Sequence, residues 1–267
     1  MAKIHVFGSC SGTEPYPGRH HCSYAIEPDG TDGKLYWFDA GECCAHTAYN
    51  MGLDPMKIQK IFISHVHADH VCGLPHLLWT VYKLSTRQKG RIPDAGGISV
   101  IIPDTKIFDA AKALLDSGRI RDVYPVTCEE THEGVLFDDG IVKVEAIHNN
   151  HIKHEDGTPW RSFSFRTTVR ENGTEKVIVG SGDIKHPTDV EYFLKDGCDA
   201  FMMESGHHNP PEVAKWIVEN DVKIGKLCFI HHGRHLLDTY DDTVKALRAE
   251  YGDREVIVTE DAMTICI

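Results

Sequence analysis

The chain has 267 residues, 41% hydrophobic and 25% charged, which is ordinary for a globular protein that can bury a large core without disulfides. A net charge of −12 argues against a protein that coats nucleic acid, and no apolar run approaches the ~20 residues that a membrane span needs. Nine cysteines without a CxxC pair, and a start without a signal-peptide pattern, predict a cytoplasmic protein with reduced thiols and one domain over residues 1–267. The unusual feature is the histidine content, 18 residues.

Short runs of β-branched and aromatic residues alternate with helical patterns along the chain and predict an α/β fold. Strands are predicted at 3–7, 23–27, 34–38, 60–64, 99–102, 142–147, 162–169, 176–179, 200–203, 227–230 and 255–258. Apolar residues at helical spacing predict helices over 74–84 and 107–115, and another begins at the prolines 210–211. Asp-Gly and Asn-Gly pairs at 29–33 and 172–173 predict hairpins. We therefore expect two sheets packed face to face, with helices outside and functional groups at the carboxyl ends of strands.

One histidine cluster directly follows a predicted strand. The strand over 60–64 runs into the sequence His65-Val66-His67-Ala68-Asp69-His70, which places four ligand-type residues within six positions. Imidazoles and carboxylates are the side chains that bind zinc and related divalent ions. A polar loop of hydrogen-bonded histidines would explain one such residue but not this spacing. We therefore predict that His65, His67, Asp69 and His70 bind metal.

The pattern HxHxDH is the signature of the metallo-β-lactamase superfamily, which the chain resembles at this motif. The segment 7–15, FGSCSGTEP, resembles the opening glycine-rich turn of the ribonuclease Z-like branch, and Phe38-Asp39-Ala40-Gly41-Glu42 resembles its D-x-G-E turn. The resemblance implies a four-layered αββα sandwich with a hydrolytic site that holds two metal ions. It implies two divalent cations as cofactors, with zinc as the first choice and manganese or iron as alternatives.

The resemblance also implies a third histidine ligand and an aspartate that bridges the two ions. The third histidine follows a strand, and His148, His151 and His154 are available there. We favour His151, which lies a few positions after the end of the apolar strand, with His148 as the fallback. The strand ending in Val-Gly-Ser-Gly leads to Asp183, which we predict to be the bridging aspartate.

The last ligand expected in this superfamily follows the strand over 227–230, where the chain has His231 and His232. We choose His231, because it directly follows the strand. The ligand set implied by the resemblance is then His65, His67 and His151 for one ion, Asp69, His70 and His231 for the other, and Asp183 between them.

A candidate proton donor lies in the segment Glu204-Ser205-Gly206-His207-His208-Asn209. In the ribonuclease Z-like branch a Gly-His pair followed by Ser-Thr contains a catalytic histidine, and this chain keeps the pair but has His-Asn after it. We predict that His207 protonates the leaving group, with His208 as the alternative. Asp69 is expected to act in catalysis as well, by orienting a hydroxide shared by the two ions.

The substrate expectation comes from what the chain does not contain. Between His151 and Asp183 there is room for two strands around the Asn-Gly turn, but not for the protruding arm with which ribonuclease Z enzymes grip tRNA. We expect a phosphodiesterase that acts on a small anionic diester, such as a cyclic nucleotide, and no membrane or extended nucleic acid as partner; a homodimer is left open. A β-lactamase or thioester hydrolase, or a tRNA 3′-processing endonuclease, is the alternative. Arg234, with His232 and His235, is a candidate for neutralising the anion.

Overall fold

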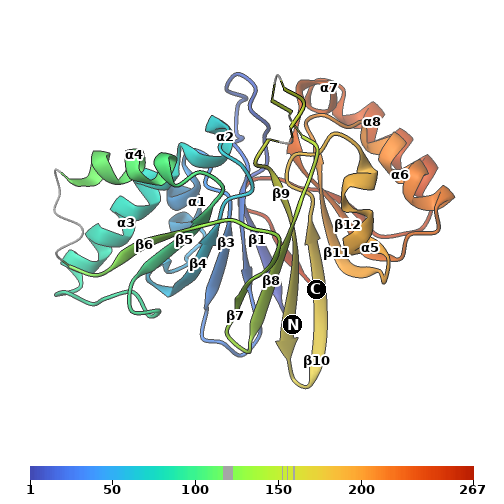
Figure 1. Cartoon of the computed structure of the whole chain (residues 1–267). Helices are drawn as coiled ribbons and strands as arrows, with labels where there is room; N and C mark the ends of the chain where they lie inside the picture. Colours follow the sequence, from blue (N-terminus) through green and yellow to red (C-terminus); the bar gives the residue numbers. More distant parts are fainter. Residues whose placement is uncertain (117–122, 152, 155, 159) are drawn as a thin grey trace.

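The computed structural model of the protein describes residues 1–116, 123–151, 153–154, 156–158 and 160–267. Two seven-stranded sheets face each other, and helices cover the outer face of each (Figure 1). One sheet is flanked by α1 (Cys44–Asn50), α3 (Leu74–Arg87) and α4 (Thr105–Asp116), and the other by α5 (Glu191–Leu194), α6 (Pro210–Glu219) and α8 (Tyr240–Tyr251). This is the predicted four-layered αββα sandwich.

Each sheet mixes parallel and antiparallel pairs. The first has the order β14 (Thr264–Cys266), β1 (Lys3–Gly8), β2 (Ser23–Glu27), β3 (Leu35–Phe38), β4 (Ile58–Phe62), β5 (Ile98–Ile102), β6 (Val126–Glu130). The second has the order β13 (Val256–Val258), β12 (Ile224–His232), β11 (Cys198–Ser205), β10 (Thr174–Gly180), β9 (Phe163–Glu171), β8 (Val142–His148), β7 (Gly134–Asp138). The predicted hairpins are confirmed, because β2 with β3 and β9 with β10 are antiparallel neighbours.

Apolar side chains form three layers, one between the sheets and one under each set of helices. Strand β3 shows how one strand serves two layers. Leu35 and Trp37 face the helices, whereas Tyr36 and Phe38 pack between the sheets. Successive side chains of a strand point to opposite faces, so a strand buried on both faces is apolar at every position.

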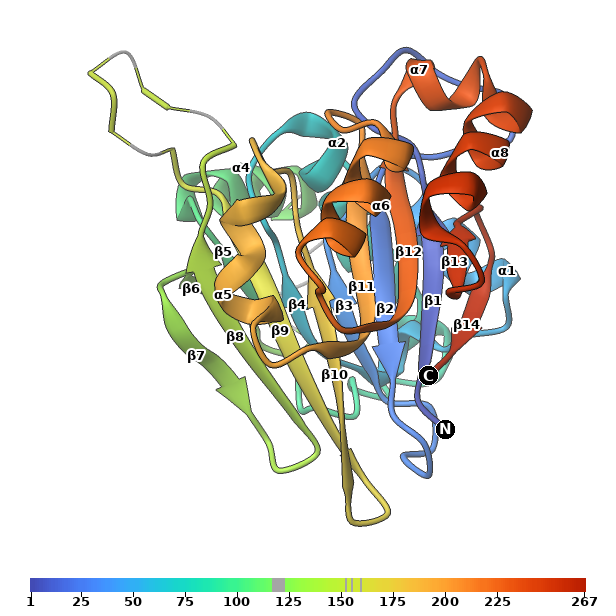
Figure 2. The same cartoon turned by 90° about the vertical axis from the view of Figure 1, so that its right-hand side faces the viewer.

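The strands β4, β8, β10, β11 and β12 bring the chemistry-bearing loops together. The first four are each followed by one or more of the predicted site residues, and β12 contains His231 near its end. The parallel pairing of β10, β11 and β12 places their carboxyl ends at one edge. Figure 2 shows the two chain termini at the opposite end of the sandwich, where the Ile267 amide donates to the Ala2 carbonyl oxygen at 2.9 Å.

Four more short elements lie between the longer ones: α2 (Ala68–Val71), α7 (Arg234–Leu237) and the 3-10 turns at Pro55–Lys57 and Pro187–Val190. Strand β4 is displaced from its predicted range of 60–64, because it ends at Phe62 and the Ser64 amide donates to the Asp39 side chain at 2.7 Å. Among the described residues, no helix combines the length and apolar character that crossing a membrane requires.

Candidate metal centre and cleft

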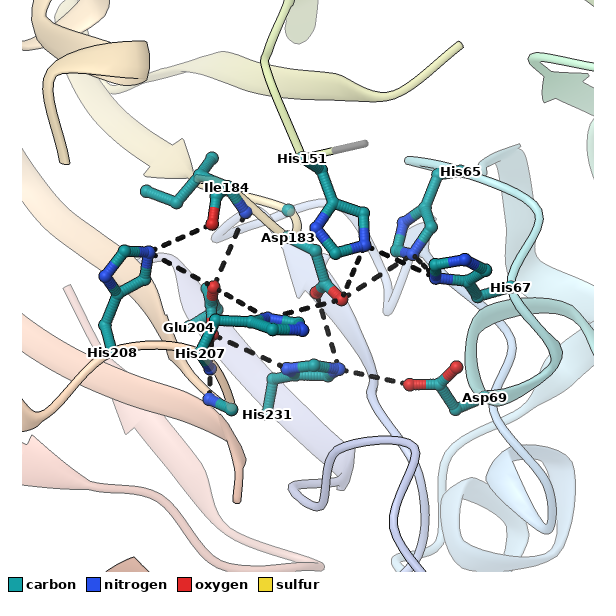
Figure 3. A network of polar contacts seen from close by, with 12 residues as sticks. His65, His67, Asp69, His151, Asp183, Ile184, Glu204, His207, His208 and His231 are labelled. Atoms are coloured by element: carbon teal, nitrogen blue, oxygen red, sulfur yellow. Dashed lines mark hydrogen bonds and ion pairs between the residues drawn. The ribbon is translucent and has the colours of Figure 1, made fainter. Parts of the chain in front are cut away.

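Seven side chains converge in two overlapping groups at this edge, and Figure 3 labels all of them except His70. Within each group the potential ligand atoms lie within 4.8 Å of one another. The first group is His65, His67, His151 and Asp183, and the second is Asp69, His70, Asp183 and His231. These are the seven residues that the sequence analysis selected, and Asp183 belongs to both groups, as a bridging ligand would.

Asp39, at the end of β3, orients two of these histidines. Its Oδ2 accepts from His70 Nδ1 at 2.8 Å and from the Ser64 hydroxyl at 2.9 Å. That hydroxyl lies 3.0 Å from His65 Nδ1 and can accept its proton. Both histidines therefore turn Nε2 toward the centre, which is how second partners usually fix a metal-binding imidazole. The backbone of Asp39 has φ of 54°, in the left-handed region, and this conformation directs its carboxylate toward His70 and Ser64.

A bulge decides which of the two adjacent histidines on β12 faces the centre. Glu204 pairs with Ile230 and Ser205 pairs with His232, so His231 is an extra residue in the ladder, with φ of 57°. Its Nε2 lies 3.1 Å from Asp69 Oδ2. His232 is fully buried elsewhere and donates from Nε2 to the Thr259 carbonyl oxygen at 2.8 Å.

The positions of His148, His151 and His154 show which of the three candidates for the third histidine lies at the centre. His151 Nε2 lies 3.3 Å from His67 Nδ1, inside the first group. His148 belongs to β8 instead, and its ring packs on Phe163 with a centroid separation of 4.5 Å. His154 hydrogen-bonds through its backbone to Thr158 within the loop. The structure thus brings His151, and neither alternative, to the centre.

The residues of this centre fit divalent ions. Asp183 is 2% exposed, and its Oδ1 and the His231 Nδ1 have no hydrogen-bond partner although both atoms are buried. Burial lowers the pKa of His151 to about 4 and that of His65 well below its usual value, so both imidazoles are neutral at pH 7 and can donate a lone pair. Carboxylates and imidazoles that face one point are the donor set of a zinc site.

The centre forms the floor of an open cleft of about 480 Å³. One wall is the glycine-rich turn 11–13, and the other contains Gly206 and His207. Gly12 is needed there, because a Cβ atom at this position would lie 2.8 Å from the Asp69 carboxyl carbon. The turn therefore packs against the carboxylate that we expect to orient the nucleophile.

Buried Glu204, which the sequence analysis did not single out, holds the candidate proton donor (Figure 3). Its Oε1 accepts from His207 Nδ1 at 3.1 Å, and its Oε2 accepts from the backbone amides of Gly206 and His207 at 2.7 and 2.9 Å. The Glu204 hydrogen bond raises the pKa of His207. Burial alone would raise the pKa of Glu204, but the hydrogen bond from His207 and the nearby His231 imidazole lower it to about 2. His208 does not line the cleft, because its Nε2 donates to the Ile184 carbonyl oxygen at 3.0 Å and lies 3.5 Å from Glu204 Oε1.

Of the three residues expected to neutralise an anion, only Arg234 lines the cleft. Its Nε donates to Asp238 at 3.1 Å, its Nη1 lies 3.6 Å from Glu14, and its guanidinium lies 5.2 Å from the centre of the Tyr16 ring. The expectation for His232 was wrong, because burial lowers its pKa to about 3 and keeps it neutral. His235 hydrogen-bonds to the His208 carbonyl oxygen at 3.2 Å instead.

Comparison with known proteins identifies the fold. The structure of YhfI from Bacillus subtilis, a metallo-β-lactamase fold protein, superposes with a TM-score of 0.73 at 15% identity, covering 99% of this chain and 98% of YhfI. Unliganded yeast PDE1 superposes with a TM-score of 0.71 at 13% identity, covering 98% of each chain. The expected metallo-β-lactamase fold is confirmed.

Sequence relatives and a family profile identify the branch. Ribonuclease Z of Geobacillus kaustophilus is 32% identical over 158 residues, 59% of this chain and 46% of that protein, so the chain matches less than half of the relative's length. Ribonuclease Z and PDE1 belong to the ribonucleases and phosphodiesterases of this fold, which are metal-dependent hydrolases, and this confirms the expected enzyme class at this coarse level. The profile described as anti-Pycsar protein Apyc1 matches residues 21–208, a range that holds every predicted site residue except His231. Because the match spans more than half of the sequence, the chain belongs to the anti-Pycsar protein Apyc1 family.

Proposed function

We propose that the protein is a phosphodiesterase that hydrolyses a small phosphate diester, such as a cyclic nucleotide. The observation that supports this most is the position of His207 at the cleft, beside the two ligand groups and hydrogen-bonded to Glu204. Hydrolysis of a diester expels an alkoxide, which needs a proton donor that is still protonated near neutral pH. A histidine whose pKa is raised by a buried carboxylate suits that task.

Two divalent cations are part of this proposal, with zinc as the first choice. The residues that would hold them are His65, His67 and His151 on one side, Asp69, His70 and His231 on the other, and Asp183 between. Bound there, the ions would supply an activated water and part of the charge stabilisation that diester hydrolysis requires.

The chain's own groups divide the remaining work. The Asp69 carboxylate lines the cleft and can accept a hydrogen bond from the attacking water, which orients it. His207, held through Nδ1, leaves its Nε2 for donation to the departing oxygen. Arg234 is fixed by carboxylates on two segments and adds positive charge at the rim, which favours entry of an anion.

The size and charge of the protein support a small substrate. The cleft volume of about 480 Å³ is in the range of pockets for small ligands. The net charge of −12 offers no compensation for the missing arm that a long RNA would need. We therefore propose that precursor tRNA is not cleaved efficiently at physiological salt.

Metal analysis of protein reconstituted with zinc tests the centre. We expect close to two ions in the wild type, loss of both in Asp183→Asn, and loss of mainly one in His231→Ala. His148→Ala is the matched control for His151→Ala, because His148 is the last residue of the strand that precedes His151 but lies outside both groups. A wild type that binds no zinc, or a His148→Ala variant that loses zinc while His151→Ala retains it, would contradict the proposal.

A substrate panel tests the activity. The zinc-loaded protein is assayed with cyclic nucleotides, bis(nitrophenyl) phosphate, a phosphomonoester, a chromogenic β-lactam, a thioester and precursor tRNA. We expect cleavage of the small diesters, and we expect Arg234→Ala to raise KM for them more than Arg234→Lys does. Activity confined to the β-lactam or the thioester, or efficient processing of tRNA, would overturn the assignment.

A further inference from the structure

The histidines of the first ligand group are not held alike. His65 Nδ1 is hydrogen-bonded to Ser64, and the His151 ring lies among the rings of His65, His67 and His207. His67 turns Nδ1 toward the centre, and its outer Nε2, like the outer Nδ1 of His151, makes no hydrogen bond within the described part of the chain. His67 is also only half-buried, so the protein interior does not confine its ring.

Trp160 packs on this ring. Its indole centroid lies 4.7 Å from that of His67 at an interplanar angle of 34°, and 5.8 Å from that of His65 at 74°. Offset and edge-to-face arrangements at these separations are the favourable geometries for aromatic pairs. One indole thus contacts two of the three histidines of the first group.

The backbone beside Trp160 is hydrogen-bonded to the loop that leads into the HxHxDH motif. The Ser162 amide donates to the Trp160 carbonyl oxygen at 2.8 Å, and the next amide, that of Phe163, donates to the Ser64 carbonyl oxygen at 3.0 Å. Ser64 directly precedes His65. The position of the indole is therefore coupled to the segment that begins the HxHxDH motif.

We propose that Trp160 is a positioning residue for the metal centre, which holds the His67 ring in its ligating orientation by aromatic packing in place of a hydrogen bond. Partners that orient a ligand histidine commonly change metal affinity by 10- to 100-fold when removed. Loss of the indole should therefore weaken the ion bound by the first group and leave the second ion in place. This inference rests on the proposed two-ion centre but not on the identity of the diester.

Two variants of Trp160 distinguish the effect of aromatic packing from the effect of side-chain volume. Trp160→Phe keeps a flat ring, and Trp160→Leu keeps an apolar side chain without one. Trp79→Leu, on α3 and away from the centre, is the matched control. Metal-free protein is mixed with zinc in competition with a chromogenic chelator, and far-UV circular dichroism verifies the fold of each variant.

We expect Trp160→Leu to weaken one of the two zinc ions by about tenfold while the other changes less than about twofold. Trp160→Phe should remain within about threefold of the wild type, and Trp79→Leu should be unchanged. Wild-type affinity for both ions in Trp160→Leu, equal weakening of both, or a Trp160→Phe variant as weak as Trp160→Leu would each overturn the inference. A wild type that binds no zinc would instead overturn the proposed centre itself.

Cobalt provides a second measurement that does not depend on activity. A bound Co²⁺ ion quenches nearby indole emission, so the wild type should lose part of its tryptophan fluorescence on binding. Trp160→Phe should bind Co²⁺ without that loss, whereas Trp79→Leu should retain it. Equal quenching in Trp160→Phe and the wild type would show that Trp160 does not adjoin the bound ion, and the inference would fail.

Discussion

Replacing His207 by alanine is expected to slow hydrolysis in proportion to how much the leaving group needs a proton. The His207 Nδ1 is occupied by Glu204 at 3.1 Å, so only Nε2 can serve the substrate, and nearly half of the side chain is open to the cleft. Removing a general acid typically costs 10²- to 10⁴-fold in rate, or about 3–5 kcal/mol of transition-state stabilisation. That loss should appear with an alkyl leaving group and largely vanish with nitrophenolate, which departs without protonation.

The assay compares kcat for two methyl phosphodiesters that differ only in the leaving group, which is an alkoxide in one and nitrophenolate in the other. The zinc content of each variant is measured as well. His208→Ala is the control, because His208 does not line the cleft and its Nε2 donates to the Ile184 carbonyl oxygen. We expect this control to change kcat by less than about threefold. Equal losses on both substrates in His207→Ala with zinc retained would refute the assignment of His207 as the proton donor.

Three further predictions follow from the same contacts. Glu204→Gln should move the alkaline fall of kcat to lower pH, because the Glu204 hydrogen bond raises the pKa of His207 and only protonated His207 can act; a pH–rate profile tests this. Gly12→Ala should lower kcat about 100-fold and weaken the ion bound by the second group, because its Cβ would push aside the Asp69 carboxylate, and steady-state kinetics with metal analysis measure both. Burial lowers the folded-state pKa of His232 to about 3, while the unfolded chain takes up the proton near 6.5. Stability is therefore lost as the pH falls from 6.5 toward 3, and urea unfolding should show the wild type losing about 2 kcal/mol more than His232→Gln between pH 7 and 5.

Local sequence determined the features whose residues lie close together along the chain. The HxHxDH motif follows a buried strand, so its four side chains must emerge at one point, and the structure brings them together. The Asn-Gly hairpin and the doubly buried strand β3 were likewise readable, because turn chemistry and side-chain alternation are local. Strands β6, β7 and β14 were missed. The first two are edge strands with mostly exposed or half-buried residues, and β14 has three residues, so none shows a clear alternation.

Tertiary structure decided what depends on neighbouring strands. His231 and His232 are adjacent and chemically identical, and the bulge opposite β11 alone turns the first toward the centre and the second toward Thr259. Trp160 meets His67 only because the loop after β8 packs beside the segment that contains the HxHxDH motif. Strand register and sheet packing fix these distances through contacts between segments far apart in the chain, and the periodicity of any one segment contains no information about them.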